Sequence, residues 1–66
     1  MSEVVVNENT LGYPYKIEEF TWLGILSSRK GGWKWENGPV PLSPLDTVRT
    51  ATAEDFHLYR VYRREL

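Results

Sequence analysis

The most apolar part of the chain is Phe20-Thr21-Trp22-Leu23-Gly24-Ile25-Leu26. Thr21 and Ile25 are β-branched, and such residues lose side-chain freedom in a helix. Gly24 would cost a helix interior about 1 kcal/mol relative to Ala. We therefore predict a strand here and expect it to turn at Gly31-Gly32, so that Trp33-Lys34-Trp35-Glu36 returns as the second strand of a central hairpin.

A helix is the competing interpretation of the same residues. Glu18 and Glu19 would lie in its first turn, and Arg29 and Lys30 in its last turn, where each charge complements the helix dipole. Gly31 would then follow as the C-terminal cap. The β-branched residues and the internal glycine favour the strand over this helix.

The expected second strand has alternating chemistry. Its two tryptophans would point to one face, and Lys34 and Glu36 to the other, because successive side chains of a strand alternate. Asn37-Gly38 then supplies a turn. Three prolines follow, which exclude a helix, so Val40-Pro41-Leu42 should be extended, at a sheet edge or in a covering loop.

The beginning of the chain carries a weaker pattern. Glu3 to Val6 is a short run rich in β-branched residues, and Asn7-Glu8-Asn9-Thr10 has the composition of a turn. Residues 1–10 are therefore expected to form an edge strand or a flexible arm.

The last third of the chain combines a strand signal with a helix signal. Thr47 to Ala51 is rich in β-branched residues and predicts a third strand. Thr52 is an expected N-cap with Asp55 in the capping-box position, so a helix should begin at about Ala53. Its apolar stripe would contain Phe56, Leu58, Tyr59, Val61, Tyr62 and Leu66. The alternative ends this helix near His57 and makes Leu58 to Tyr62 a strand.

These elements predict an α+β fold with a small antiparallel sheet of about three strands and a C-terminal helix packed on it. At 66 residues the chain is expected to be a single small domain, 1–66, without an internal linker.

Composition limits the chemistry that the chain can perform. It contains no cysteine and one histidine, His57, which excludes disulfides and thiolate sites and leaves no ligand cluster for a metal. We expect no catalytic residues, no cofactor and no enzyme activity. The formal net charge of −1 gives no general attraction to nucleic acid or membrane, and no apolar run is long enough to cross a membrane. A cytoplasmic protein is expected, consistent with the absence of cysteine.

Basic and aromatic residues supply the candidate binding site, which consists of Arg29, Lys30, Trp33, Lys34, Trp35, Tyr59, Tyr62 and Arg63. Tyrosine, tryptophan and arginine are common in the energetically dominant part of protein interfaces. We therefore expect a non-enzymatic protein-interaction module, a small adaptor or inhibitor, whose partner is another protein or a second copy of the chain. The alternative is a weak single-stranded nucleic-acid-binding domain that uses the segment from Arg29 to Trp35. In size and cysteine content the chain is similar to small accessory proteins of phages and other mobile elements, a resemblance that no motif carries.

Overall fold

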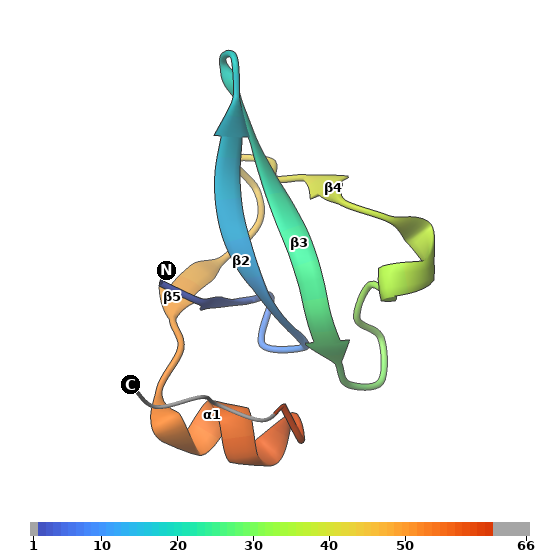
Figure 1. The fold of residues 1–66 in the computed structure, drawn as a ribbon, viewed down its shortest axis with the longest axis vertical. Helices are drawn as coiled ribbons and strands as arrows, with labels where there is room; N and C mark the ends of the chain where they lie inside the picture. Colours follow the sequence, from blue (N-terminus) through green and yellow to red (C-terminus); the bar gives the residue numbers. More distant parts are fainter. Residues whose placement is uncertain (1, 62–66) are drawn as a thin grey trace.

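A computed structural model describes residues 2–61, and Figure 1 shows their arrangement. Within these residues, one antiparallel sheet contains five strands in the order β4-β3-β2-β1-β5, with a short helix at one end. The elements are β1 (Val4–Val6), β2 (Thr10–Ile17), β3 (Phe20–Ser28), the 3-10 helix η1 (Trp35–Asn37), β4 (Val40–Pro41), β5 (Val48–Thr50) and α1 (Ala53–Leu58). The predicted antiparallel sheet with a C-terminal helix is confirmed, but five strands replace the expected three or so.

Strands β2 and β3 form a long hairpin at the centre of the sheet. Their register ends at the pair Ile17↔Phe20, which leaves Glu18 and Glu19 as a two-residue turn. The strand predicted at 20–26 is confirmed, whereas its expected partner at 33–36 is wrong. β2 offers eight paired positions and reaches β3 through a tight turn, so this pairing loses less chain entropy than one made across a longer loop.

The segment that follows β3 is held as a loop against the turn between β1 and β2. The Arg29 N–H donates to the Asn9 carbonyl at 2.8 Å, and the Trp33 N–H donates to Thr10 Oγ1 at 3.1 Å. Gly32 lies so close to this turn that a Cβ atom would clash with the Asn9 carbonyl oxygen. Because these contacts fix the path of the loop, the chain enters η1 at Trp35 instead of forming the strand expected at 33–36.

The two edges of the sheet are β4 and β5. In β4, Val40 pairs with Leu23 and Pro41 pairs with Trp22, which confirms the extended edge alternative for residues 40–41. Proline is tolerated at this position because an edge strand leaves one side of its backbone unpaired. β5 confirms the strand predicted between Thr47 and Ala51.

Strand β1 lies inside the sheet, between β2 and β5. Val5 pairs with Leu11 on one side and with Arg49 on the other, and both Val5 and Val6 are buried. A strand does form at residues 4–6, but its expected position at the edge of the sheet is wrong, and so is the alternative of a flexible arm for these residues. Three residues carry little local pattern, and their internal position results from pairing with β5, which comes much later in the chain.

Side chains are buried on both faces of the sheet. On one face, Val5 and Leu11 pack against Phe56 and Tyr59 from α1 and the residue that follows it. Because side chains alternate along a strand, the neighbouring residues lie on the opposite face. That face buries Val6, Thr10 and Leu23. The sheet therefore buries side chains on both faces, which helps a short chain to bury enough surface.

Helix α1 begins as the sequence predicts and ends earlier. Thr52 is the N-cap, and a complete capping box joins it to Asp55. The helix ends at Leu58, and Arg60 adopts a positive φ of 58°, which a continuing helix does not allow. The predicted extension along 59–61 is therefore wrong, and neither do these residues form the alternative strand. The remainder of that prediction lies outside the described residues.

The end of α1 and the first face of the sheet are linked by a side-chain hydrogen bond. Ser27 Oγ on β3 donates to the Tyr59 carbonyl at 2.8 Å.

No helix within residues 2–61 has the length and hydropathy needed to span a bilayer.

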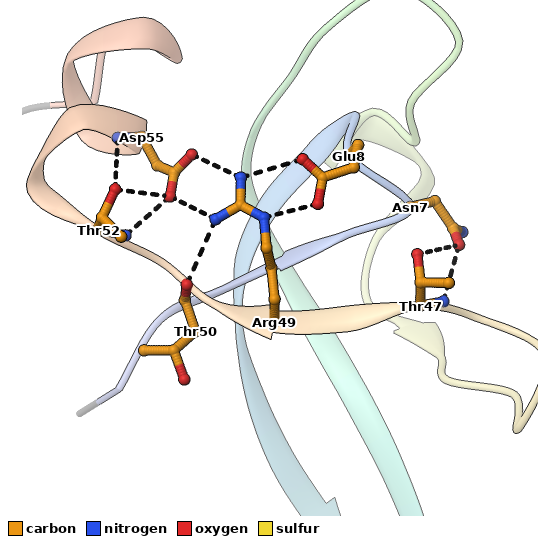
Figure 2. Close-up of polar contacts among 7 residues, drawn as sticks. All are labelled: Asn7, Glu8, Thr47, Arg49, Thr50, Thr52 and Asp55. Carbon is orange, nitrogen blue, oxygen red and sulfur yellow. Dashed lines mark hydrogen bonds and ion pairs between the residues drawn. The ribbon is translucent and has the colours of Figure 1, made fainter.

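Arg49 connects three parts of the fold, as Figure 2 shows. Its guanidinium donates to both carboxylate oxygens of Glu8, at 2.6 and 3.1 Å, and to both of Asp55, at 2.7 and 2.8 Å. Glu8 belongs to the predicted turn after β1, which is confirmed and in which Asn7 and Glu8 have φ values of 52° and 56°. Arg49 therefore joins β5, the β1–β2 turn and α1.

The same contacts keep both carboxylates ionised. The hydrogen bond from Arg49 is the largest cause of a lowered pKa for Asp55, followed by the bond from the backbone of Thr52. The pKa of Glu8 is also lowered, again chiefly by its hydrogen bond with Arg49. Each carboxylate therefore stabilises the folded state when it is ionised.

Asp55→Asn is expected to destabilise the fold near neutral pH by about 1–3 kcal/mol, since it removes the charge that faces Arg49 and an acceptor for Thr52. The folded-state pKa of Asp55 lies below the ordinary value of 3.8, so its contribution is present above that value and is lost as the pH falls further. Urea denaturation across this range should show a smaller acid-induced loss of stability in the variant than in the wild type.

Glu54→Gln is the matched control, because Glu54 is the exposed neighbour of Asp55 in the same first turn. It should keep the acid dependence of the wild type. A similar flattening of the pH dependence in both variants would contradict a specific role for the Asp55–Arg49 contact.

Candidate interaction surface

A group of large side chains lies on one face of the β2–β3 hairpin. We call it the hairpin face, and it consists of Tyr13, Tyr15, Ile17, Phe20 and Trp22. Residues directly opposite each other in an antiparallel pair point to the same side of the sheet, as do residues two apart on one strand. The pairs Tyr15↔Trp22 and Ile17↔Phe20 therefore place all five side chains on one surface.

Gly24 determines how the first ring of this surface lies. It is the residue opposite Tyr13, and a Cβ atom at this position would clash with the Tyr13 ring. The ring therefore lies across the backbone of β3, in the space that the glycine leaves. It also stacks on Tyr15, with ring centroids 5.9 Å apart and planes inclined by 29°. The two tyrosines thus form an ordered aromatic platform.

The hairpin face becomes more exposed toward the turn. Tyr13, Tyr15 and Trp22 are partly buried, whereas Ile17 and Phe20 are 53% and 63% exposed. Figure 1 shows the reason, because α1 lies at one end of the molecule and the hairpin turn at the other. The helix covers this side of β2 at Leu11, two residues before Tyr13, and the hairpin continues beyond it.

Two carboxylates stand at the exposed end of the hairpin face. Glu18 and Glu19 form the turn, and neither makes an ion pair or a side-chain hydrogen bond with any residue between 2 and 61. The nearest cation along β2 is Lys16, but it is opposite Thr21 and so projects from the other face. The turn is therefore a local concentration of negative charge beside exposed apolar side chains.

Glu18 occupies a backbone conformation that favours glycine. Its φ is 58°, and left-handed φ values cost a residue with a Cβ atom roughly 1–2 kcal/mol. Two-residue hairpin turns with a positive φ at the first position usually have glycine there. The chain keeps a charged side chain at this position despite that cost.

The residues predicted from sequence to bind a partner are only partly brought together. Arg29, Lys30 and Lys34 are exposed on the loop after β3, Trp33 is partly buried, and Trp35 is 72% exposed. These five residues therefore lie in the segment between β3 and the start of η1, and not on the hairpin strand expected at 33–36.

Tyr59 is separated from that loop set by its burial. It is 5% exposed and belongs to the hydrophobic core between α1 and the sheet, so its side chain does not contribute to an accessible surface. Tyr62 and Arg63 lie outside the described residues.

His57 is exposed on α1. Among residues 2–61, no group of three or more histidine, aspartate or glutamate side chains is arranged to hold a metal ion. The buried polar side chains of the same residues are all hydrogen-bonded, so none is left aimed at a ligand.

Sequence analysis did not identify the hairpin face. A signal was present, because Tyr13, Tyr15 and Ile17 alternate before Glu18-Glu19, and Phe20 and Trp22 alternate after it. It was missed because a Glu-Glu pair is not a recognised turn signal, whereas Gly31-Gly32 is.

Comparison with protein-family models, with curated proteins and with solved structures found no match to this chain.

Glu18→Gly is expected to stabilise the protein by roughly 0.5 kcal/mol, because relief of the left-handed strain exceeds the entropy that glycine adds to the unfolded chain. Glu19→Gly removes the same charge at a position without a positive φ and should be neutral or destabilising. Thermal and urea denaturation of both variants would measure the difference. Equal effects in the two variants would show that charge, and not backbone strain, controls the stability of this turn.

Proposed function

We propose that this protein is a non-enzymatic protein-interaction module that binds its partner through the hairpin face. The observation that carries the proposal is the pair Ile17↔Phe20, two large apolar side chains that face each other and are more than half exposed. They continue a line of partly exposed aromatic rings, so the apolar surface is contiguous along the hairpin. Contiguous exposed apolar surface commonly marks an interaction site.

The energetics support an interaction at this surface. Transfer of a large apolar side chain from water into an interface contributes about 1.5–3 kcal/mol when burial is complete. Ile17 and Phe20 are more than half exposed, so much of this free energy would be gained when a partner covers them. Trp22 and the tyrosines belong to the residue types that dominate interface energies.

The geometry lowers the cost of association. Tyr13 is held in the space above Gly24 and stacked on Tyr15, so these rings lose little freedom when a partner covers them. We propose an adaptor or inhibitor that acts in the cytoplasm, since a chain without cysteine uses no disulfide of the kind found in secreted small domains.

Replacement of both exposed residues, Ile17→Ser with Phe20→Ser, is expected to abolish partner binding and leave the fold intact. Captured proteins would be quantified from an extract of the cells that make the protein, and self-association would be measured by analytical ultracentrifugation. Leu45→Ser is the matched control, because Leu45 is 92% exposed in the loop before β5. If every interaction of the wild type survives the double substitution, the hairpin face is not the binding surface.

A second candidate function is weak binding of single-stranded nucleic acid through the loop from Arg29 to Trp35. The observation that favours it is the exposure of Trp35 together with Arg29, Lys30 and Lys34. Cations can follow phosphates while an exposed ring stacks on a base, which contributes about 1–3 kcal/mol per base. Three cations allow few phosphate contacts, so such binding would be weak at physiological salt.

Titration of a fluorescent single-stranded oligonucleotide at low and moderate salt tests this candidate. Trp35→Ala should weaken binding roughly 5-fold to 150-fold, given the energy of one stacked base. Leu58→Ala is a control on the exposed side of α1 and should bind like the wild type. Absence of binding at low salt eliminates the candidate.

A further inference from the structure

We infer that the partner of the hairpin face is a basic polypeptide segment whose arginine or lysine side chains contact the aromatic platform and the Glu18-Glu19 turn. This inference rests on the proposed function and adds the chemistry of the partner. It follows from the side chains along the surface, which has aromatic rings at one end and unpaired carboxylates at the other.

The aromatic end of the surface suits a cation. A guanidinium or ammonium group placed over the face of a tyrosine or tryptophan, within about 6 Å of the ring centre, is attracted by the ring's negative face. Tyr13 and Tyr15 present neighbouring rings at a shallow mutual angle, and Trp22 lies directly across from Tyr15. Guanidinium groups can also stack flat on such rings.

The acidic end differs from the two carboxylates that contact Arg49. Glu36 and Glu54 are also without an ion pair among residues 2–61, but they do not belong to the hairpin face. Glu8 and Asp55 are both neutralised by Arg49, whereas Glu18 and Glu19 have no cation among residues 2–61. Lys16 projects from the opposite face and does not compensate them. A partner that supplies a cation here would complete the pairing without displacing any existing contact.

Two other occupants fit this charge distribution less well. A nucleic acid would bring phosphates toward Glu18 and Glu19, and like charges repel. A second copy bound through the same face would add two more of these carboxylates and no cation of its own from this face. A basic segment satisfies both ends of the surface at once.

The size of the surface indicates the length of the segment. Strand residues advance about 3.4 Å each, so Tyr13 and Ile17 are separated by roughly 14 Å along β2. An extended peptide of about five or six residues therefore reaches from the aromatic platform to the turn. Arginines two to four positions apart could contact the rings and the carboxylates together.

Three synthetic peptides of equal length provide the test. The first carries arginines separated by Gly and Ser, the second has Gln in place of each Arg, and the third has Glu there. Each would be titrated into isotopically labelled full-length protein at low salt, and backbone amide shifts would report both the affinity and the site. We expect only the arginine peptide to bind and its shifts to map to β2, β3 and the Glu18-Glu19 turn.

Matched variants separate local charge from general charge. The double variant Glu18→Gln with Glu19→Gln should lower the affinity for the arginine peptide about fivefold. The control Glu36→Gln with Glu54→Gln removes two exposed carboxylates elsewhere and should change this affinity less than twofold. Tyr15→Ala should weaken binding by a similar factor through loss of the ring.

Several outcomes would overturn the inference. These are equal binding of the Gln peptide, equal effects of the two carboxylate pairs, shifts that map away from the hairpin, and absence of arginine-peptide binding at millimolar concentration. If an oligonucleotide caused amide shifts at the hairpin face, the partner would be a nucleic acid and not a basic polypeptide segment. None of these decides the proposed function, which depends on whether Ile17→Ser with Phe20→Ser abolishes binding of cellular partners or self-association.

Discussion

Strands β2 and β3 pair from Thr10↔Ser28 to Ile17↔Phe20, and the remaining strands attach to the two sides of this hairpin. β4 adds to the outer side of β3, while β1 and then β5 add to the outer side of β2. The register of this one pairing therefore fixes which side chains face α1, which lie on the opposite buried face, and which form the hairpin face. A shift by one residue would exchange these sets, because neighbouring side chains point in opposite directions.

Polar contacts supplement the small hydrophobic core. Arg49 links α1 to the sheet and to the β1–β2 turn through two carboxylates, in a chain that has neither disulfides nor a described metal cluster within residues 2–61. Partly exposed ion pairs contribute modestly to stability, so the clearer effect of this network is orientation. It holds the helix against Val5 and Leu11, at one end of the molecule. The helix therefore does not cover the far end of the hairpin.

The uncovered end differs chemically from the Arg49 network. In the Arg49 network the charges are paired, whereas at the Glu18-Glu19 turn they are unpaired and lie beside Ile17 and Phe20. A small protein that folds around a central hairpin can thus present one end of that hairpin to a partner while the other end supports the core. Fold and proposed function use the same pairing of β2 with β3.

The amino-acid sequence by itself determined the features that depend on neighbouring residues. These are the strand at 20–26, the turn after β1, the extended edge around Val40, the strand before Thr52 and the capping box that begins α1. Each arises from backbone preferences or from side-chain bonds within a few positions, so its cause is visible in the local sequence.

Only the tertiary structure decided which strands pair and which aromatic rings are buried. β1 is internal because β5 joins it, the segment at 33–36 is a loop because Thr10 and Asn9 hold its backbone, and Tyr59 is in the core because Leu11 and Val5 lie above it. These features depend on the burial of side chains and on the loss of chain entropy when distant segments come together. Residues adjacent in sequence do not determine these long-range contacts, so the local pattern did not show that, within residues 2–61, Phe20 and Trp35 are the exposed aromatic side chains.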